Sequence, residues 1–381
     1  MLRVQSQVTE SNVLAPPRVG VERAHSALLP PLRAGDDVGE ADIRAAQRGW
    51  GGEVSSPASP TVSWWHNAEL AVVTVGALAL ALTLPLATSV FGLLLFGVLH
   101  NYFELRYLVG RFSGLFTRRL FELTLLGLTV IVMIRLLPLG GLARPLEIVA
   151  VYGLLAGVLT LRLRHRPILL GGGLLVVGAA LAASLRYSDY HFVVITHLHN
   201  VLPLVFLWEW VGRGASTPAA RTFRALNLTW AIGLPLLLLA GAFDGLAARV
   251  ALVDWTPAAR IVGDVDGYVR AMTPPGGDSV LGGRLLAVFA LLQLLHYYAW
   301  CRFFPAVGTT EVARFNGTMA GLGLPAGRTL TGLAFALAGL VLLLMWTDFQ
   351  RGRSLYGALA SYHAYLEYAL LLLFVLSWRR A

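Results

Sequence analysis

Beyond residue 62, the chain alternates between long apolar stretches and short breaks rich in Arg, Pro and Gly. Each apolar stretch is about 20 residues long, the length that an α-helix needs to cross a lipid bilayer. Dividing the sequence at these breaks predicts ten such helices, at 67–85, 88–110, 118–138, 145–163, 167–186, 189–211, 227–246, 284–304, 327–347 and 355–377. The pattern therefore predicts an all-α fold, a polytopic membrane helix bundle of about ten transmembrane helices.

The composition agrees with this class of protein. The chain is 56% hydrophobic and only 13% charged, and its mean hydropathy is +0.67, outside the range of soluble globular proteins. Its expected surroundings are membrane lipid. All 30 basic residues are Arg, a bias that fits a GC-rich bacterial genome. We therefore expect a multi-pass protein of the bacterial inner membrane.

The first 62 residues differ from the rest of the chain. They are rich in Pro, Ala, Ser and Gly, carry 7 acidic against 6 basic residues, and lack a sustained apolar period. A segment of this composition cannot bury enough apolar surface to fold alone. We expect a disordered N-terminal arm over 1–62 and an integral membrane domain over 63–381.

The distribution of arginine predicts the orientation. With a cytoplasmic N-terminus, the inner loops and tail hold 15 arginines, whereas the short outer connections hold 5. The long outer loop at 247–283 is left out of this comparison, because long loops cross the membrane largely regardless of their charge. Both termini are predicted to be cytoplasmic. The inner arginines set this topology and contact anionic lipid, and nothing indicates a nucleic-acid partner.

Histidines inside the apolar stretches are the main chemical signal. Four of them, His100, His199, His296 and His363, lie in four different predicted helices. Ionisable side chains at that depth are costly, so a function is expected for them. The pattern His-x-Tyr-apolar-Glu occurs twice, which places Glu104 and Glu367 one helical turn after a histidine and on the same helix face.

These four histidines also share a predicted depth. Their helices all run from outside to inside, and the histidines lie about 12, 10, 12 and 8 residues from the outer ends, within about 6 Å of one level. Shared depth and direction predict one common site. A single intramembrane histidine is about as often a hydrogen-bonding contact between helices as it is a metal ligand. Glu104 and Glu367 can be protonated structural carboxyls.

The sixth predicted helix offers a choice of ligand. His197 and His199 are two residues apart, so a regular helix points them in roughly opposite directions. Pro203 lacks the N–H that would bond the carbonyl of His199, and it tends to kink the helix there. We expect His199 to face the site and keep His197 as the substitute ligand.

A ring of imidazoles with carboxylates suits iron, zinc or copper. Cys301 is the single cysteine, which excludes a cysteine-built zinc or iron–sulfur site. Membrane zinc hydrolases usually place a paired His-x-x-x-His on one helix, and this sequence has none, so iron is expected ahead of zinc or copper. Glu104 and Glu367 are the expected catalytic carboxyls, as ligands, as groups that orient the histidines, or as proton carriers.

Two resemblances bear on this interpretation. In architecture and histidine count, the chain resembles membrane oxygenases that hold non-haem iron beside a lipid substrate, including bacterial dioxygenases that cleave β-carotene, although it lacks their His-Gly-x-x-Asp-like opening. Over about a third of its length, it resembles a set of uncharacterised bacterial multi-pass membrane proteins, through Leu-His-Asn at 99–101 and 198–200 and through Gln293-x-x-His296-Tyr297-x-x-Trp300-x-Arg302-x-x-Pro305. The first resemblance implies a non-haem iron oxygenase acting on a hydrophobic small-molecule substrate, and the second implies no activity.

Two other functions stay open at this point. One is a proton-coupled transporter that uses the His and Glu side chains as a relay. The other is an electron carrier in which the four histidines form two axial pairs to haem.

Overall fold

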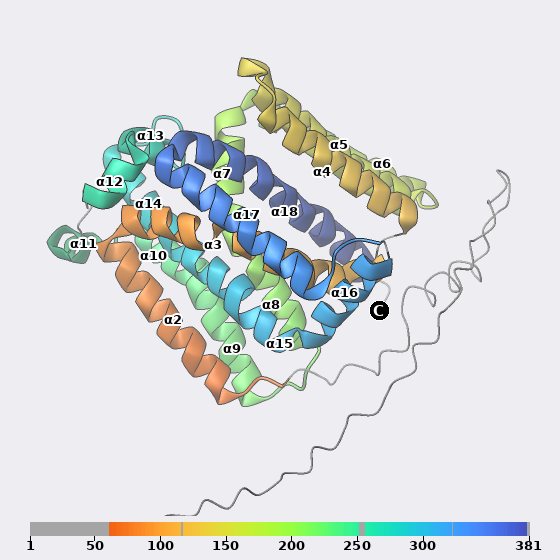
Figure 1. Cartoon of the computed structure of the whole chain (residues 1–381), viewed down its shortest axis with the longest axis horizontal. Helices are drawn as coiled ribbons and strands as arrows, with labels where there is room; N and C mark the ends of the chain where they lie inside the picture. The colour runs from red at the N-terminus through yellow and green to blue at the C-terminus, as the bar shows by residue number, and fades with distance from the viewer. Residues whose placement is uncertain (1–60, 116, 251–255, 322, 379–381) are drawn as a thin grey trace, which may run out of the picture. The chain divides into compact units, whose positions relative to one another are not determined.

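The apolar stretches fold as helices. The computed structural model of the protein describes residues 61–115, 117–250, 256–321 and 323–378, and every regular element in those ranges is helical (Figure 1). The long helices are α2 (Trp64–Thr83), α3 (Pro85–Phe112), α4 (Arg118–Leu136), α5 (Ala143–Leu163), α6 (Pro167–Arg186), α7 (Ser188–Val201), α8 (Pro203–Gly212), α9 (Pro218–Leu228), α14 (Ser279–Tyr297), α16 (Thr309–Gly321), α17 (Gly327–Thr347) and α18 (Phe349–Trp378). The predicted all-α, polytopic membrane bundle is confirmed.

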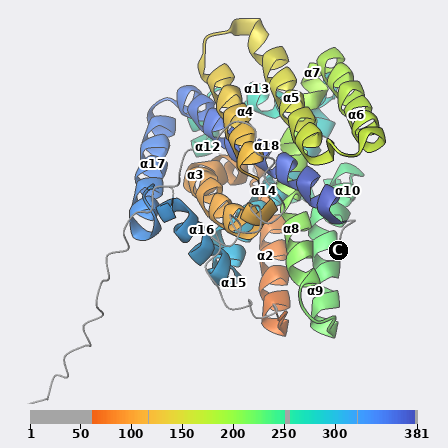
Figure 2. The same ribbon diagram turned by 90° about the vertical axis from the view of Figure 1, so that its right-hand side faces the viewer.

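Of the ten predicted spans, α4 is the exception. Nine spans within the described ranges are long and apolar enough to cross a membrane. The remaining predicted segment, 118–138, forms α4. It carries more charged residues than any one of these nine spans, among them Arg119 and Arg135. Helix α4 runs beside α5 and packs against it and against α18 (Figures 1 and 2), so we retain it as a predicted tenth crossing. The cytoplasmic location of both termini also stays a prediction.

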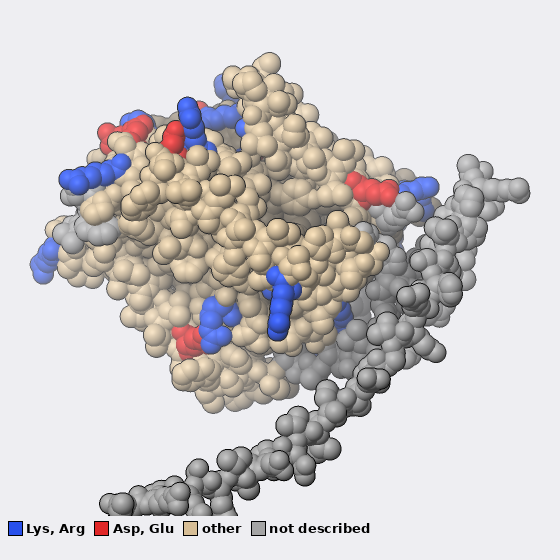
Figure 3. Space-filling view, viewed as in Figure 1, with Lys and Arg blue, Asp and Glu red and all other residues tan. Residues whose placement is uncertain are grey.

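The outward-facing surface is apolar, as lipid contact requires. No residue of α6 is buried, and Ile168 and Leu175 are 89% and 74% exposed. The face shown in Figure 3 carries only scattered charged side chains on a largely uncharged surface. In water such a surface is an association site, whereas in a bilayer it is the ordinary contact with lipid.

Prolines and π-helical turns interrupt the long spans. The predicted helix 189–211 is two helices, α7 and α8, and Pro203 begins the second, where its missing N–H is tolerated. The span that begins with α14 continues through a π-helical turn, Tyr298–Phe303, into the short helix α15 (Phe304–Val307). A second π-helical turn, Thr229–Gly233, joins α9 to α10 (Leu234–Leu239).

The predicted outer loop 247–283 is largely folded. It contains the end of α11 (Asp244–Val250), together with α12 (Thr256–Val262) and α13 (Val265–Arg270). Ala258, Tyr268 and Met272 are buried against a cluster that includes residues of α3 and α14. The segment therefore covers the ends of the helices that carry two of the four histidines.

Helices α3 and α16 cross in close contact at Gly110. A Cβ at this position would lie 1.9 Å from the carbonyl oxygen of Glu311, so a side chain cannot be added without moving α16. Small residues at helix crossings permit such approach of backbones in membranes.

The predicted arm, 1–62, lies outside the described residues except at its end. Val62 is described, and it packs against the main hydrophobic core, which joins residues from α2 through α18. The membrane domain therefore includes residues on the arm side of the predicted boundary.

Candidate metal centre

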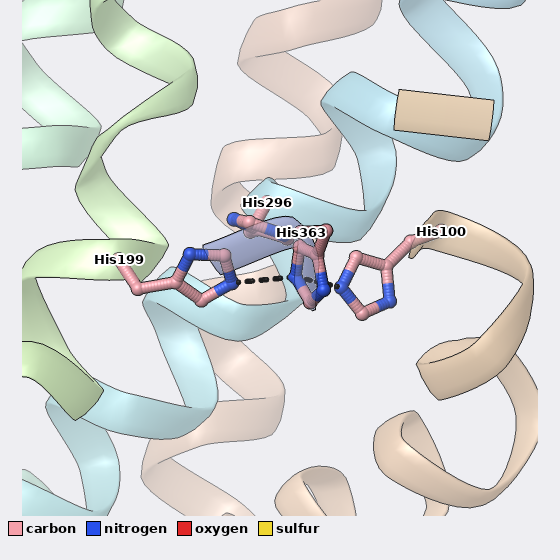
Figure 4. A group of neighbouring side chains, drawn as sticks. All are labelled: His100, His199, His296 and His363. Atoms are coloured by element: carbon pink, nitrogen blue, oxygen red, sulfur yellow. Dashed lines mark hydrogen bonds between the residues drawn. The ribbon is translucent and has the colours of Figure 1, made fainter. Parts of the chain in front are cut away.

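Four helices bring four histidines together at one point. His100 comes from α3, His199 from α7, His296 from the last turn of α14 and His363 from the middle of α18 (Figure 4). One nitrogen from each ring forms a group whose atoms all lie within 4.8 Å of one another. The predicted convergence of these four side chains is therefore present in the structure.

Two of the nitrogen–nitrogen separations suit a single metal ion. His363 Nε2 lies 3.2 Å from His100 Nε2 and 3.1 Å from His199 Nε2. With metal–nitrogen bonds of about 2.1 Å, two ligand nitrogens stand about 3.0 Å apart at a right angle and about 3.4 Å apart at a tetrahedral angle. The observed separations fall between these values.

In two of the rings, Nδ1 already has a hydrogen-bond partner outside the group of four. His100 Nδ1 lies 3.1 Å from the carbonyl oxygen of Phe96, and His199 Nδ1 lies 2.8 Å from a carboxyl oxygen of Glu367. An Nδ1–H that donates to a carbonyl or carboxylate leaves the Nε2 lone pair free, the arrangement usual for metal-binding histidines. Both lone pairs then point toward His363.

Hydrogen bonds among the imidazoles cannot satisfy this cluster. If His100 and His199 both accept at Nε2, the single proton on His363 Nε2 is shared between two acceptors. His296 is fully buried, and neither of its ring nitrogens makes a hydrogen bond with any described group. Buried polar atoms without partners are costly, and a cation among the lone pairs removes that cost.

Two carboxyl groups lie beside the imidazoles. Glu104 and Glu367 are both 0% exposed and close enough to interact with each other. Glu104 Oε2 is 3.9 Å from His363 Nε2, and the Glu104 carboxyl lies against that of Glu367. Glu367 orients His199, and Glu104 lies beside both the second carboxyl and the ring nitrogens.

His197, the substitute ligand, does not join this group. Its Nε2 instead lies 2.9 Å from the carbonyl oxygen of Met272, under the outer segment. The helix α7 continues to Val201, so the two neighbouring histidines keep the opposite directions of a regular helix. The break that Pro203 causes comes too late to turn His197 inward.

The chain changes its helical form directly after His296. The π-helical turn begins at Tyr298 and ends two residues before Pro305, which has no N–H to offer the carbonyl of Cys301. Single π-helical turns are frequent at functional sites, because they redirect side chains within a helix. Pro305 is the residue that could have indicated this irregularity from the sequence.

A polar network near the site was not expected from the sequence. Tyr365 donates to Glu147 Oε1 at 2.5 Å, and Arg135 reaches both oxygens of Glu147 at 2.6 and 2.9 Å. Arg135 also donates to the carbonyl oxygen of Gly357 at 2.7 Å. This network fixes α4 and α5 to α18, the helix that carries His363 and Glu367.

The rings are packed too closely for haem. Neighbouring ring centroids are 4.6 to 5.0 Å apart, and the facing nitrogens are 3.1 and 3.2 Å apart. An axial pair would need its nitrogens about 4 Å apart, with a macrocycle between the rings. The geometry favours a single ion over haem.

Comparison with known proteins adds no relative. Neither the protein-family models, nor the curated proteins, nor the solved structures contain a match to this chain. Functional inference therefore rests on the site itself.

Proposed function

We propose that this protein is an integral membrane metalloenzyme that holds one transition-metal ion among His100, His199, His296 and His363. Iron is the favoured metal, ahead of zinc and copper, and the favoured reaction is oxidation or cleavage of a hydrophobic substrate that enters from the bilayer. The convergence of four ligand nitrogens within 4.8 Å of one another carries the proposal.

The donor set supports a transition metal. Imidazole nitrogen suits iron, copper, nickel and zinc, and the described ligand group contains no thiolate. The four imidazoles would hold the ion, and a redox-active ion held there would supply oxidation chemistry. The histidines hold and orient the ion, and Glu367 fixes the tautomer of His199.

Burial supports a lipid-soluble substrate. His100, His296 and His363 are 1%, 0% and 3% exposed, whereas the side chain of His199 is 15% exposed. Access to the centre is therefore expected beside His199, on the side of α7. A polar molecule would lose its hydration along this path without compensation, so an apolar one is favoured.

Glu104 is the proposed proton carrier. It is buried beside His363 and against the carboxyl of Glu367. A carboxyl group in this position can accept or release a proton at the reacting substrate, and the adjoining carboxyl can pass that proton on.

Elemental analysis of purified full-length protein tests the proposal. Protein produced with iron, zinc and copper in the medium should contain about one transition-metal ion per chain, predominantly iron. His296→Ala should lose this metal and remain folded, since removing an unpartnered imidazole from the interior is favourable. His165→Ala is the matched control, because His165 is exposed and outside the cluster. Absence of stoichiometric metal from wild-type protein produced in this medium would refute it.

A proton-coupled transporter is the second candidate. The observation that favours it is the pair of buried, mutually close carboxyl groups of Glu104 and Glu367 beside titratable rings. The same elemental analysis separates the two functions. Metal-free protein that moves protons in liposomes, and loses this activity in Glu104→Gln, would establish the transporter.

A further inference from the structure

A cavity lies where α15 and α16 pack against α3, and its lining contains none of the four histidines. It holds about 160 Å³, room for several waters or a small headgroup. Its lining includes Phe103, Arg106, Tyr107, Phe304, Thr309 and Val312. The walls are thus mostly aromatic and aliphatic, with one cation.

Arg106 is the unusual member of this lining. Its guanidinium stacks over the ring of Tyr102 at 5.3 Å, and its Nε atom is buried without a hydrogen bond to any described group. No ion pair with a carboxylate of the described residues is found for it. By contrast, Arg111, one turn further along the same helix, is paired with Glu209 at 2.5 Å.

A guanidinium inside a spanning helix needs a counter-charge. Arg106 lies within the span Pro85–Leu115, where the surroundings are poorer in water than at a protein surface. Arginine stays protonated there, so it draws an anion, water or the membrane interface toward itself. The adjoining cavity offers space for an anion directly at the guanidinium.

We propose that this cavity binds an amphiphile with an anionic headgroup. The carboxylate or phosphate of the headgroup pairs with Arg106, with the Thr309 hydroxyl as a second donor. The first methylenes lie against Phe103, Tyr107 and Phe304, and the rest of the chain extends out of the cavity, which is too small to hold it. A free inorganic anion would satisfy Arg106 but leave the aromatic walls without a partner, so an amphiphile fits both parts of the cavity. This site is independent of the proposed metal centre, because it uses none of the four histidines.

Binding of radiolabelled oleate to the purified full-length protein in neutral detergent tests the site. Oleate should bind saturably, and Arg106→Gln should weaken it by about tenfold or more, the effect of losing one charged hydrogen bond. Radiolabelled oleyl alcohol, which has the same chain without the charge, should bind more weakly and equally to both proteins. Arg119→Gln, which changes an exposed arginine outside the cavity, is the matched control.

A second variant guards against an indirect effect of Arg106→Gln. Val312→Trp fills the cavity without changing its charge, and it should displace oleate while circular dichroism and gel-filtration elution stay as in the wild type. Equal oleate affinity in the wild type, Arg106→Gln and Val312→Trp would overturn the proposal. So would displacement of oleate by millimolar inorganic phosphate, since that outcome assigns a site for free anions instead.

Discussion

Two of the groups of polar side chains inside this bundle differ in how their members are paired. In the first group, Arg111 contacts Glu209, and Arg213 contacts Glu311 at 3.0 Å and the hydroxyl of Tyr107 at 3.1 Å. Every charged member of this group has a partner of opposite charge. It joins α3, α8 and α16, and we call it the ion-pair group.

The histidine group has the opposite character. Its ring nitrogens face one another, neither ring nitrogen of His296 bonds a described side chain, and Glu104 lies against a second carboxyl, that of Glu367. Paired buried charges need nothing further and serve to join helices, whereas converging acceptors call for a cation. Pairing of opposite charges, more than burial, therefore separates the ion-pair group from the histidine group.

The largest expected effect is loss of the metal from His363→Ala. His363 Nε2 lies 3.2 Å from His100 Nε2 and 3.1 Å from His199 Nε2, so its removal takes away the ligand nitrogen that the other two face. Metal affinity should fall by more than about 100-fold, beyond the loss typical of an outer-shell partner. His197→Ala is the matched control, and equal metal loss in both variants, measured by mass spectrometry, would refute the assignment.

Glu209→Ala should break the ion-pair group instead. Arg111 and Arg213 would lose a shared carboxylate while still partly buried, which costs about 3 kcal/mol of unfolding free energy. Denaturant unfolding in mixed micelles measures this loss. The metal content per folded chain should stay at the wild-type level, and its loss would show that the two groups are not separate.

A smaller effect is expected for Glu367→Ala. The variant removes the acceptor of His199 Nδ1–H and frees the ring to adopt the other tautomer. Metal affinity should fall by about 10 to 100-fold. Glu367→Gln keeps an acceptor oxygen and should recover part of that loss. A merely structural role would instead lower stability in both variants without changing metal affinity.

Deleting residues 1–60 should have the smallest effect. Their composition predicts no packed core, so the unfolding free energy and metal content of the remaining chain should match the wild type within experimental error. A truncated protein that aggregates or loses its metal would show that the arm packs on the membrane domain.

Within the site, sequence reasoning named the residues but not their partners. Depth and helix direction singled out His100, His199, His296 and His363, because an ionisable group in an apolar stretch is visible in one dimension. The carbonyl of Phe96, which engages His100 Nδ1, is a backbone group with no sequence signal. The pairing of Arg135 with Glu147 could not be predicted either, since it depends on how α4 and α5 pack together.

The sequence by itself determined the helices, their membrane setting and the six side chains of the candidate centre. These depend on hydropathy and on the cost of burying ionisable groups, both properties of short segments. Tertiary structure alone decided that His197 points to Met272, that Arg111 is paired and that Arg106 faces a cavity. Such outcomes depend on distances of a few ångströms between helices far apart in the chain, which no local pattern of residues encodes.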